Sequence, residues 1–160
     1  MTSATLSPTA LDAQRRIKNK IEQDVMLYCE AIEENYKQYY IRMLERNLAD
    51  EKYDYPSYAQ EQLDAINNGT AKLMKFIVNE GRKYFKIIQC EFDTFQDRNE
   101  WREGSVHSFV NKNTGEVYKP ASWSAPHTKH VRYDLRLIKD REFLHDAKNV
   151  GWAGGYLYLK

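Results

Sequence analysis

Three of the four histidines in this 160-residue chain lie within residues 104–136, at positions 107, 127 and 130. Histidine is a common metal ligand and the usual side chain for moving a proton near neutral pH, so these residues are the first candidates for chemistry. His127 and His130 are three residues apart, but no cysteine or further ligand accompanies them at the short spacing of a structural zinc site. We therefore expect no metal, and we expect His127 and His130 to be exposed loop residues beside Lys129.

Catalytic arrangements built on these histidines are incomplete. Paired-histidine hydrolysis of a phosphodiester needs two matched His-x-Thr or His-x-Ser units, and the sequences HSF and HTK do not match. Cys90, His107 and Asp93 supply a nucleophile, a base and an acid, but no nucleophile elbow surrounds them. No P-loop or GxGxxG sequence is present either. We expect a non-enzymatic protein without a cofactor, and keep an enzyme with an unrecognised site around His107, Tyr118 and His130 as a third hypothesis.

Cations alternate with aromatic rings in the same part of the chain, a mixture that grips a phosphate backbone while bases stack on the rings. The predicted binding surface consists of Lys112, Tyr118, Lys119, Trp123, Lys129, His130, Arg132 and Tyr133. It would be extended by Lys75, Arg82, Lys83 and Lys86 if these share a sheet face with it. Glu103, Glu116 and Asp134 lie among these residues and the net charge is only +1, so electrostatics supports nucleic acid weakly.

Trp123 lies between two prolines in a loop otherwise made of small residues and lysine. It either anchors the loop onto the domain or serves as an exposed contact for a protein partner, since tryptophan in a pocket is common in both settings. We favour the anchor.

The helices and strands that position these residues are predicted from turn sequences and from the spacing of apolar residues. Two apolar runs flank Asn79-Glu80-Gly81, which indicates a hairpin with Gly81 at positive φ, and Asn113-Thr114-Gly115 indicates a second hairpin. Pro120 and Pro126 are expected to end the strand pairing. The predicted sheet is antiparallel with about four strands, over 72–79, 82–91, 105–112 and 115–119, and residues 93–104 are predicted as a connector.

One long helix is predicted over residues 9–48. Ser7 and Pro8 are a favourable start, and apolar or aromatic residues from Ile17 to Met43 recur about every 3.7 positions. A helix of that length spans on the order of 60 Å, so it either breaks or overhangs a compact domain. Its apolar stripe then packs on its own sheet, on a second copy or on a foreign partner.

Two further helices are predicted. Ser57 and Gln60 have capping-box spacing and Asn68-Gly69 supplies a stop, which indicates a short helix between them. A C-terminal helix is predicted from about 134 or 140 to 147. After a hinge at Gly154-Gly155, the tyrosines and leucines at the C-terminus either add an edge strand or enter the core.

Composition is that of an ordinary globular chain, with 42% hydrophobic and 29% charged residues. We expect a single domain over residues 1–160, with Cys29 and Cys90 free and buried in a reducing cytoplasm. The N-terminal sequence has no secretory signal pattern, and no segment approaches the ~20 apolar residues of a membrane span. A soluble intracellular protein is therefore expected.

The sequence SVHSFVNKNTGEVYKPASWSAPHTKHVRYDL, preceded by EGRKYFKII and followed later by WAGGYLY, resembles a family of small uncharacterised proteins of tailed bacteriophages, including phages of marine and cyanobacterial hosts. The resemblance covers about residues 80–136 and the GGYLY end, and leaves the long helix outside. It implies a phage product made in the cytoplasm of a bacterial host, as an accessory or host-takeover factor. It carries no activity and no catalytic residue, and the sequence HTKH departs from the family pattern.

Together these observations predict an α+β fold, with a long N-terminal helix and short helices packed on a small antiparallel sheet. The predicted function is a non-enzymatic binding module whose partner is a host or phage protein, with no membrane and a possible homodimer through the N-terminal helix. Nucleic-acid binding by the basic, aromatic hairpin is the alternative.

Overall fold

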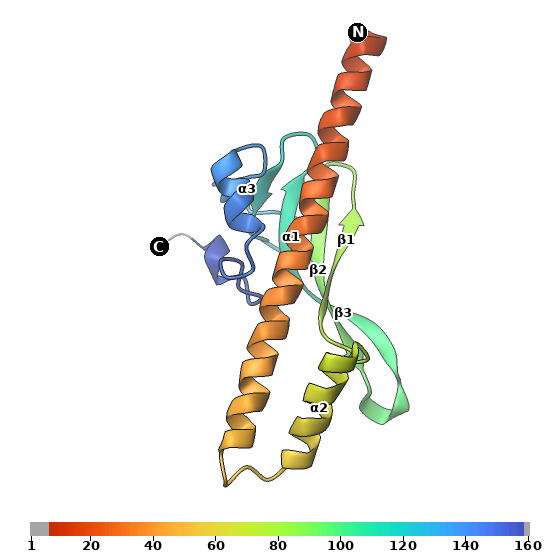
Figure 1. The fold of residues 1–160 in the computed structure, drawn as a ribbon. Coiled ribbons are helices and arrows are strands. Elements are labelled where there is room, and N and C mark those ends of the chain that lie inside the picture. Colours follow the sequence, from red (N-terminus) through yellow and green to blue (C-terminus); the bar gives the residue numbers. More distant parts are fainter. Residues whose placement is uncertain (1–6, 159–160) are drawn as a thin grey trace.

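The computed structural model of the chain describes residues 7–158, and it has the predicted α+β fold (Figure 1). The long helix α1 runs along one face of a five-stranded antiparallel sheet with strand order β1-β2-β3-β4-β5. The helices are α1 (Pro8–Ala49), α2 (Pro56–Asn68) and α3 (Ile138–Leu144), with short 3-10 helices η1 (Phe95–Asp97) and η2 (Gly155–Leu157). The strands are β1 (Lys75–Glu80), β2 (Tyr84–Asp93), β3 (Glu100–Asn111), β4 (Glu116–Tyr118) and β5 (Tyr133–Asp134).

Helix α1 is continuous and matches the predicted bounds to within one residue at each end. Its start is the predicted one: the Ser7 hydroxyl accepts a hydrogen bond from the Ala10 N–H, and Pro8 is the first helical residue. The predicted apolar stripe is buried from Ile21 to Ile32, whereas farther along α1 Tyr39 is exposed and Met43 is half-buried. Ile17 is 48% exposed because the first turns of α1 extend beyond the sheet (Figure 1). The helix therefore overhangs and does not break.

The main core lies between α1 and the sheet. From α1 it takes Ile21, Val25, Tyr28, Cys29, Ala31 and Ile32, and from the strands Phe76, Phe85, Ile87, Val110 and Val117. A second, smaller core of Leu44, Ala59 and Ile66 joins the C-terminal half of α1 to α2. In Figure 1, α2 returns alongside this half of α1.

Helix α2 ends as predicted and begins differently. Gly69 at its C-cap has φ 73° and donates its N–H to the Ala65 and Ile66 carbonyls. The capping-box prediction for Ser57 is wrong, since Tyr55 is the N-cap and makes no side-chain hydrogen bond to the helix. Proline at position 56 already starts the helix one residue before Ser57, so that serine lies inside the first turn.

The β1–β2 hairpin is present, but Gly81 does not have positive φ as predicted. The Gly81 N–H donates to the Tyr84 carbonyl at 2.9 Å, and the bend falls on the next two residues, Arg82 and Lys83. Within residues 7–158 the glycines with positive φ are Gly69, Gly115 and Gly154.

Residues 93–104 are not a connector, because they form the end of the β2–β3 hairpin, which projects from the body (Figure 1). Its turn uses Gln96, Asp97 and Asn99 at φ 53°, 60° and 46°, so residues other than glycine adopt the left-handed conformation. The Asp93 carboxylate holds this end together by accepting from the Phe95 N–H at 2.9 Å and from two arginines. Without glycine, the turn had no signal that sequence reasoning recognised.

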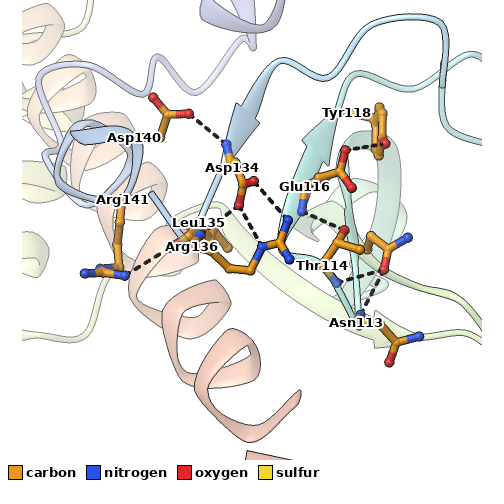
Figure 2. A network of polar contacts seen from close by, with 10 residues as sticks. Asn113, Thr114, Glu116, Tyr118, Asp134, Leu135, Arg136, Asp140 and Arg141 are labelled. Carbon is orange, nitrogen blue, oxygen red and sulfur yellow. Dashed lines mark hydrogen bonds and ion pairs between the residues drawn. The ribbon is translucent and has the colours of Figure 1, made fainter. Parts of the chain in front are cut away.

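The β3–β4 hairpin turns at Asn113-Thr114-Gly115, as predicted, with Gly115 at φ 75°. The Asn111 side chain accepts from the N–H groups of Asn113 and Thr114 at 2.9 and 3.1 Å, which fixes the turn; the two donor residues are labelled in Figure 2. Strand pairing continues to β5, a fifth strand that the sequence did not predict, in which Tyr133 pairs with Val117.

The C-terminal segment enters the core and does not add an edge strand. Leu157 is 1% exposed and Tyr156 packs against the main core, while Leu159 lies outside the described residues. Cys29 and Cys90 are free and buried, as predicted. Between residues 7 and 158, none of the helices has an apolar stretch long enough to span a bilayer.

Candidate functional site

The outer face of the sheet, turned away from α1, carries an aromatic cluster. Tyr84 of β2 contacts Phe109 of β3 and Tyr118 of β4 edge to face, with ring centres 6.1 and 6.2 Å apart. Because side chains alternate along a strand, these three rings lie on the other face of the sheet from Val110 and Val117, whose side chains enter the core under α1. Phe109 and Tyr118 are nearly buried, at 3% and 8% exposure.

The loop between β4 and β5 folds back over this cluster. The ladder of β4 ends at Tyr118, but an isolated bridge joins Pro120 to Pro126 beyond it. The Ala121 N–H donates to the Ala125 carbonyl at 2.9 Å, which closes the loop tip. The two prolines thus lie opposite each other at the base of a closed tip that carries Trp123.

Trp123 is held over the sheet by a lysine. The Lys86 Nζ lies 3.9 Å from the centre of the indole ring, within range of a cation–π interaction. The Trp123 residue keeps 47% of its surface exposed, so its contact with Lys86 attaches the loop to β2 without burying the side chain.

Two basic residues lie beside this arrangement. Arg82 and Lys83, in the β1–β2 turn, line a small hollow of about 200 Å³ together with Tyr84, Lys86, Phe109 and Ser124. Glu80 also lines this hollow, and its carboxylate accepts from Lys18 and Lys112. Among the residues that the structure describes, neither Arg82, Lys83 nor Lys86 forms an ion pair. We call the surface made of Arg82, Lys83, Tyr84, Lys86 and Trp123 the Trp123 face.

Three of the residues predicted from the sequence to bind a partner have internal roles. Lys112 Nζ donates to Glu80 Oε2 at 2.8 Å and to the Gly81 carbonyl at 2.9 Å, which ties two hairpins together. The Tyr118 hydroxyl donates to Glu116 Oε2 at 3.3 Å (Figure 2). Tyr133 belongs to the α1 side of the sheet, where its ring stacks on Phe143 at 5.1 Å.

The other predicted binding residues are spread over several surfaces. Lys119 Nζ lies 4.6 Å from the ring centre of Tyr158 in the C-terminal segment. Lys129 and His130 are exposed in the loop before β5, as expected. Arg132 has its Nε and Nη1 atoms buried without a hydrogen-bond partner among the described residues. Of the eight predicted residues, therefore, only Trp123 belongs to the Trp123 face.

From the sequence, Arg82, Lys83 and Lys86 were expected to extend the binding surface only if they shared a sheet face with it. The available signal was the strand period, because residues 84 and 86 of a strand point to the same face. The strand period does not give the position of the loop that carries Trp123, because that position depends on how the chain folds between β4 and β5.

His107 has a buried partner network on the other side of the sheet. Ile87 pairs with Ser108 and Ile88 with Val106, so His107 is the extra residue of a β-bulge. The bulge lets both His107 and Ser108 reach α1. His107 Nε2 lies 2.7 Å from the Tyr156 hydroxyl, and the Tyr28 hydroxyl bonds both to Tyr156 and to Ser108 Oγ, the latter at 3.3 Å.

Burial keeps this network uncharged at neutral pH. Desolvation lowers the pKa of His107 to about 4, although a backbone hydrogen bond with Trp152 partly opposes the shift. Burial also raises the pKa of Tyr28 and of Tyr156 well above the usual range for tyrosine. His107 itself is 7% exposed and lies on the opposite face of the sheet from Tyr118, so these two side chains do not face a common site.

No metal centre is formed within residues 7–158, where no group of three histidine, cysteine, aspartate or glutamate side chains is placed to hold an ion. His127 is half-buried and not exposed as expected, because the loop covers its Nδ1 atom, and it makes no such group with His130.

Comparison with known proteins gives one match. The model of a family of unknown function (DUF7717) matches residues 8–159. The matched range includes the long helix, which the bacteriophage resemblance left outside. No curated protein and no solved structure matches the chain.

Proposed function

Because the chain belongs to DUF7717, a family of unknown function, we propose its role from its geometry: it is a non-enzymatic binding module that engages its partner through the Trp123 face. The observation that carries this proposal is the half-exposed indole of Trp123, held in place by Lys86. An aromatic ring fixed before binding loses little conformational freedom on contact, and tryptophan is enriched at the energetic centres of interfaces. A protein of the host or of the phage is the partner that this surface suits.

A second candidate ligand is single-stranded nucleic acid. Arg82, Lys83 and Lys86 are cations without ion pairs among the described residues, and Lys86 lies against the Trp123 ring, on which a base can stack. Phosphate contacts of this kind are screened by salt, so binding would weaken steeply as ionic strength rises.

The biological setting is also part of the proposal. The hairpin sequence that ends in VYKPASW supports a bacteriophage protein that works in the cytoplasm of a bacterial host, as an accessory or host-takeover factor. Half-exposed apolar side chains of α1, among them Met26 and Leu27, support a homodimer through this helix.

The experiment compares the full-length protein with Trp123→Ala in two assays. Fluorescence anisotropy with a labelled single-stranded oligonucleotide at low and high salt tests the nucleic-acid ligand, and affinity capture from host lysate followed by mass spectrometry tests the protein partner. Trp101→Ala is the matched control, because Trp101 is 36% exposed and carries Lys75 Nζ 4.2 Å from its ring centre at a remote hairpin.

Loss of one specific interaction in Trp123→Ala, with retention in Trp101→Ala, supports the Trp123 face and identifies its ligand class. If both variants keep every interaction of the wild type, the Trp123 face is not the working surface.

A further inference from the structure

A second concave surface lies between the N-terminal part of α1, the β3–β4 turn and the start of α3. It is a cleft of about 380 Å³, which is within the usual size range of small-molecule sites. Its lining residues are Arg16, Ile17, Lys20, Ile21, Asp24, Asn113, Leu135, Arg136 and Arg141. We call it the α1–α3 cleft. It does not include any residue of the Trp123 face.

Positive charge dominates the lining of the α1–α3 cleft. Four side chains are cationic, and Asp24 is the sole carboxylate among them. Asp24 is 2% exposed and is already paired, since its Oδ1 accepts from Lys20 Nζ at 2.9 Å. Arg136 is paired as well, through the Asp134 carboxylate at 3.2 Å (Figure 2). After these pairs, Arg16 and Arg141 remain without a carboxylate partner among the described residues.

The walls of the cleft are held by hydrogen bonds before any ligand arrives. Arg141 Nη1 donates to the Leu135 carbonyl at 3.2 Å, which uses one of its five N–H donors (Figure 2). Asp140 accepts from the Asp134 N–H at 2.9 Å and fixes the start of α3 against β5. On the α1 side, the Asp24 carbonyl is 2.9 Å from His145 Nε2. A rigid arginine fork with free donors is the usual receptor for a carboxylate or a phosphate.

The base of the cleft is apolar. Ile21 and Leu135 are buried, whereas Ile17 is 48% exposed and has no covering element. A bare inorganic anion would leave this isoleucine uncovered, whereas an anion with a hydrocarbon or aromatic body would cover it. We infer that the α1–α3 cleft binds a small organic anion, whose carboxylate or phosphate group meets Arg141 and Arg16 and whose apolar body rests on Ile17.

The test is an NMR titration of the full-length protein with phenyl phosphate, phenylacetate and inorganic phosphate. We expect saturable shifts centred on Ile17, Leu135 and Arg141 with an organic anion, and binding of inorganic phosphate that is weaker by about tenfold. Comparison of the two organic probes decides which head group is preferred. No saturable shift with either organic probe up to about 10 mM, or shifts centred elsewhere, would overturn the inference.

Variants separate the cleft from general electrostatic attraction. Arg141→Gln should weaken binding of the preferred organic probe by about tenfold, because one charge-assisted hydrogen bond is lost. Arg16→Gln and Ile17→Glu change exposed positions of α1, so they keep the fold if Arg141→Gln disturbs it, and both should also weaken binding. Lys129→Gln removes the same charge from a distant loop and should bind like the wild type. Equal weakening in Lys129→Gln would refute a specific site.

Discussion

His107 Nε2 lies 2.7 Å from the hydroxyl of Tyr156, and this contact joins the bulge of β3 to the 3-10 helix η2 across 49 residues of sequence. The same hydroxyl bonds that of Tyr28 in α1. Three segments that are distant in the chain therefore meet at one buried oxygen atom. Every group there is uncharged at neutral pH, which indicates a structural role for the network.

Removal of that oxygen should destabilise the protein. Tyr156→Phe leaves the imidazole of His107 and the Tyr28 hydroxyl without this partner in the core, so we expect the free energy of unfolding to fall by about 1–3 kcal/mol. Urea denaturation followed by circular dichroism measures it. Tyr158→Phe is the control, since Tyr158 is 56% exposed, and it should change stability by less than about 0.5 kcal/mol. Equal effects of the two substitutions would contradict the role of the network.

Stability should fall in mild acid because of His107. Its pKa is about 4 in the folded protein and about 6.5 when unfolded, so between these values the unfolded chain binds more protons. The contribution of neutral His107 to the free energy of unfolding is therefore fully present above pH 6.5. It decreases as the pH falls toward 4, by about 3 kcal/mol in total. Urea denaturation at a series of pH values between these limits measures the decrease.

The slope of stability against pH, rather than stability at one pH, carries this prediction. His107→Gln should flatten the slope between pH 4 and 6.5, whatever its effect at pH 7. His130→Gln, in an exposed loop, should keep the wild-type slope. A wild-type slope in His107→Gln would show that other groups cause the acid sensitivity.

Gly115 is required by the geometry of the β3–β4 turn. It has φ 75°, and a Cβ atom there would lie 3.4 Å from the Cβ of Leu135, which is fully buried. We expect Gly115→Ala to lower the free energy of unfolding by about 1–2 kcal/mol, since a left-handed conformation is unfavourable for alanine. Gly151→Ala is the matched control, with no atom within 4 Å of the added carbon and no positive φ. Thermal or chemical denaturation of both variants measures this difference. An equal loss of unfolding free energy in both variants would show that the turn does not require glycine at position 115.

The proposed homodimer is tested by light scattering. Apolar side chains of α1 that remain half exposed include Met26 and Leu27, at 52% and 47%, and a second copy would cover them if the dimer forms through this helix. We expect a dimeric mass at micromolar concentration that becomes monomeric in the double variant Met26→Glu, Leu27→Glu. A monomeric mass for the wild type at the same concentration would end the dimer proposal.

The elements that the sequence predicted well are those whose signals are local. The 3.7-residue recurrence of apolar side chains and the Ser7-Pro8 start specify α1 almost to the residue, because capping and helix period depend only on neighbours in the chain. The Asn113-Thr114-Gly115 turn is equally local, since it depends on an asparagine side chain and on a glycine with positive φ.

The candidate site was predicted less well, because its members come from separate segments. The sequence placed Trp123 in one predicted surface with Tyr133 and Lys112, but the side chains of these two residues contact the core and a carboxylate. Its actual neighbour is Lys86, 37 positions earlier in the chain. Alternation in β2 gives the face of Lys86, whereas the loop that carries Trp123 is placed by closure of its tip over the sheet.

The sequence by itself determined the fold class, the extent of α1, the β3–β4 turn and the absence of recognisable catalytic motifs, since each of these follows from period, turn chemistry or short spacing. Only the tertiary structure decided which side chains share a surface. The bulge that turns His107 inward, the pairing of β5 with β4 and the placing of Arg16 and Arg141 in the lining of one cleft depend on long-range packing. Such contacts depend on how elements distant in the sequence pack together, so the residues that make them have no fixed spacing in the chain.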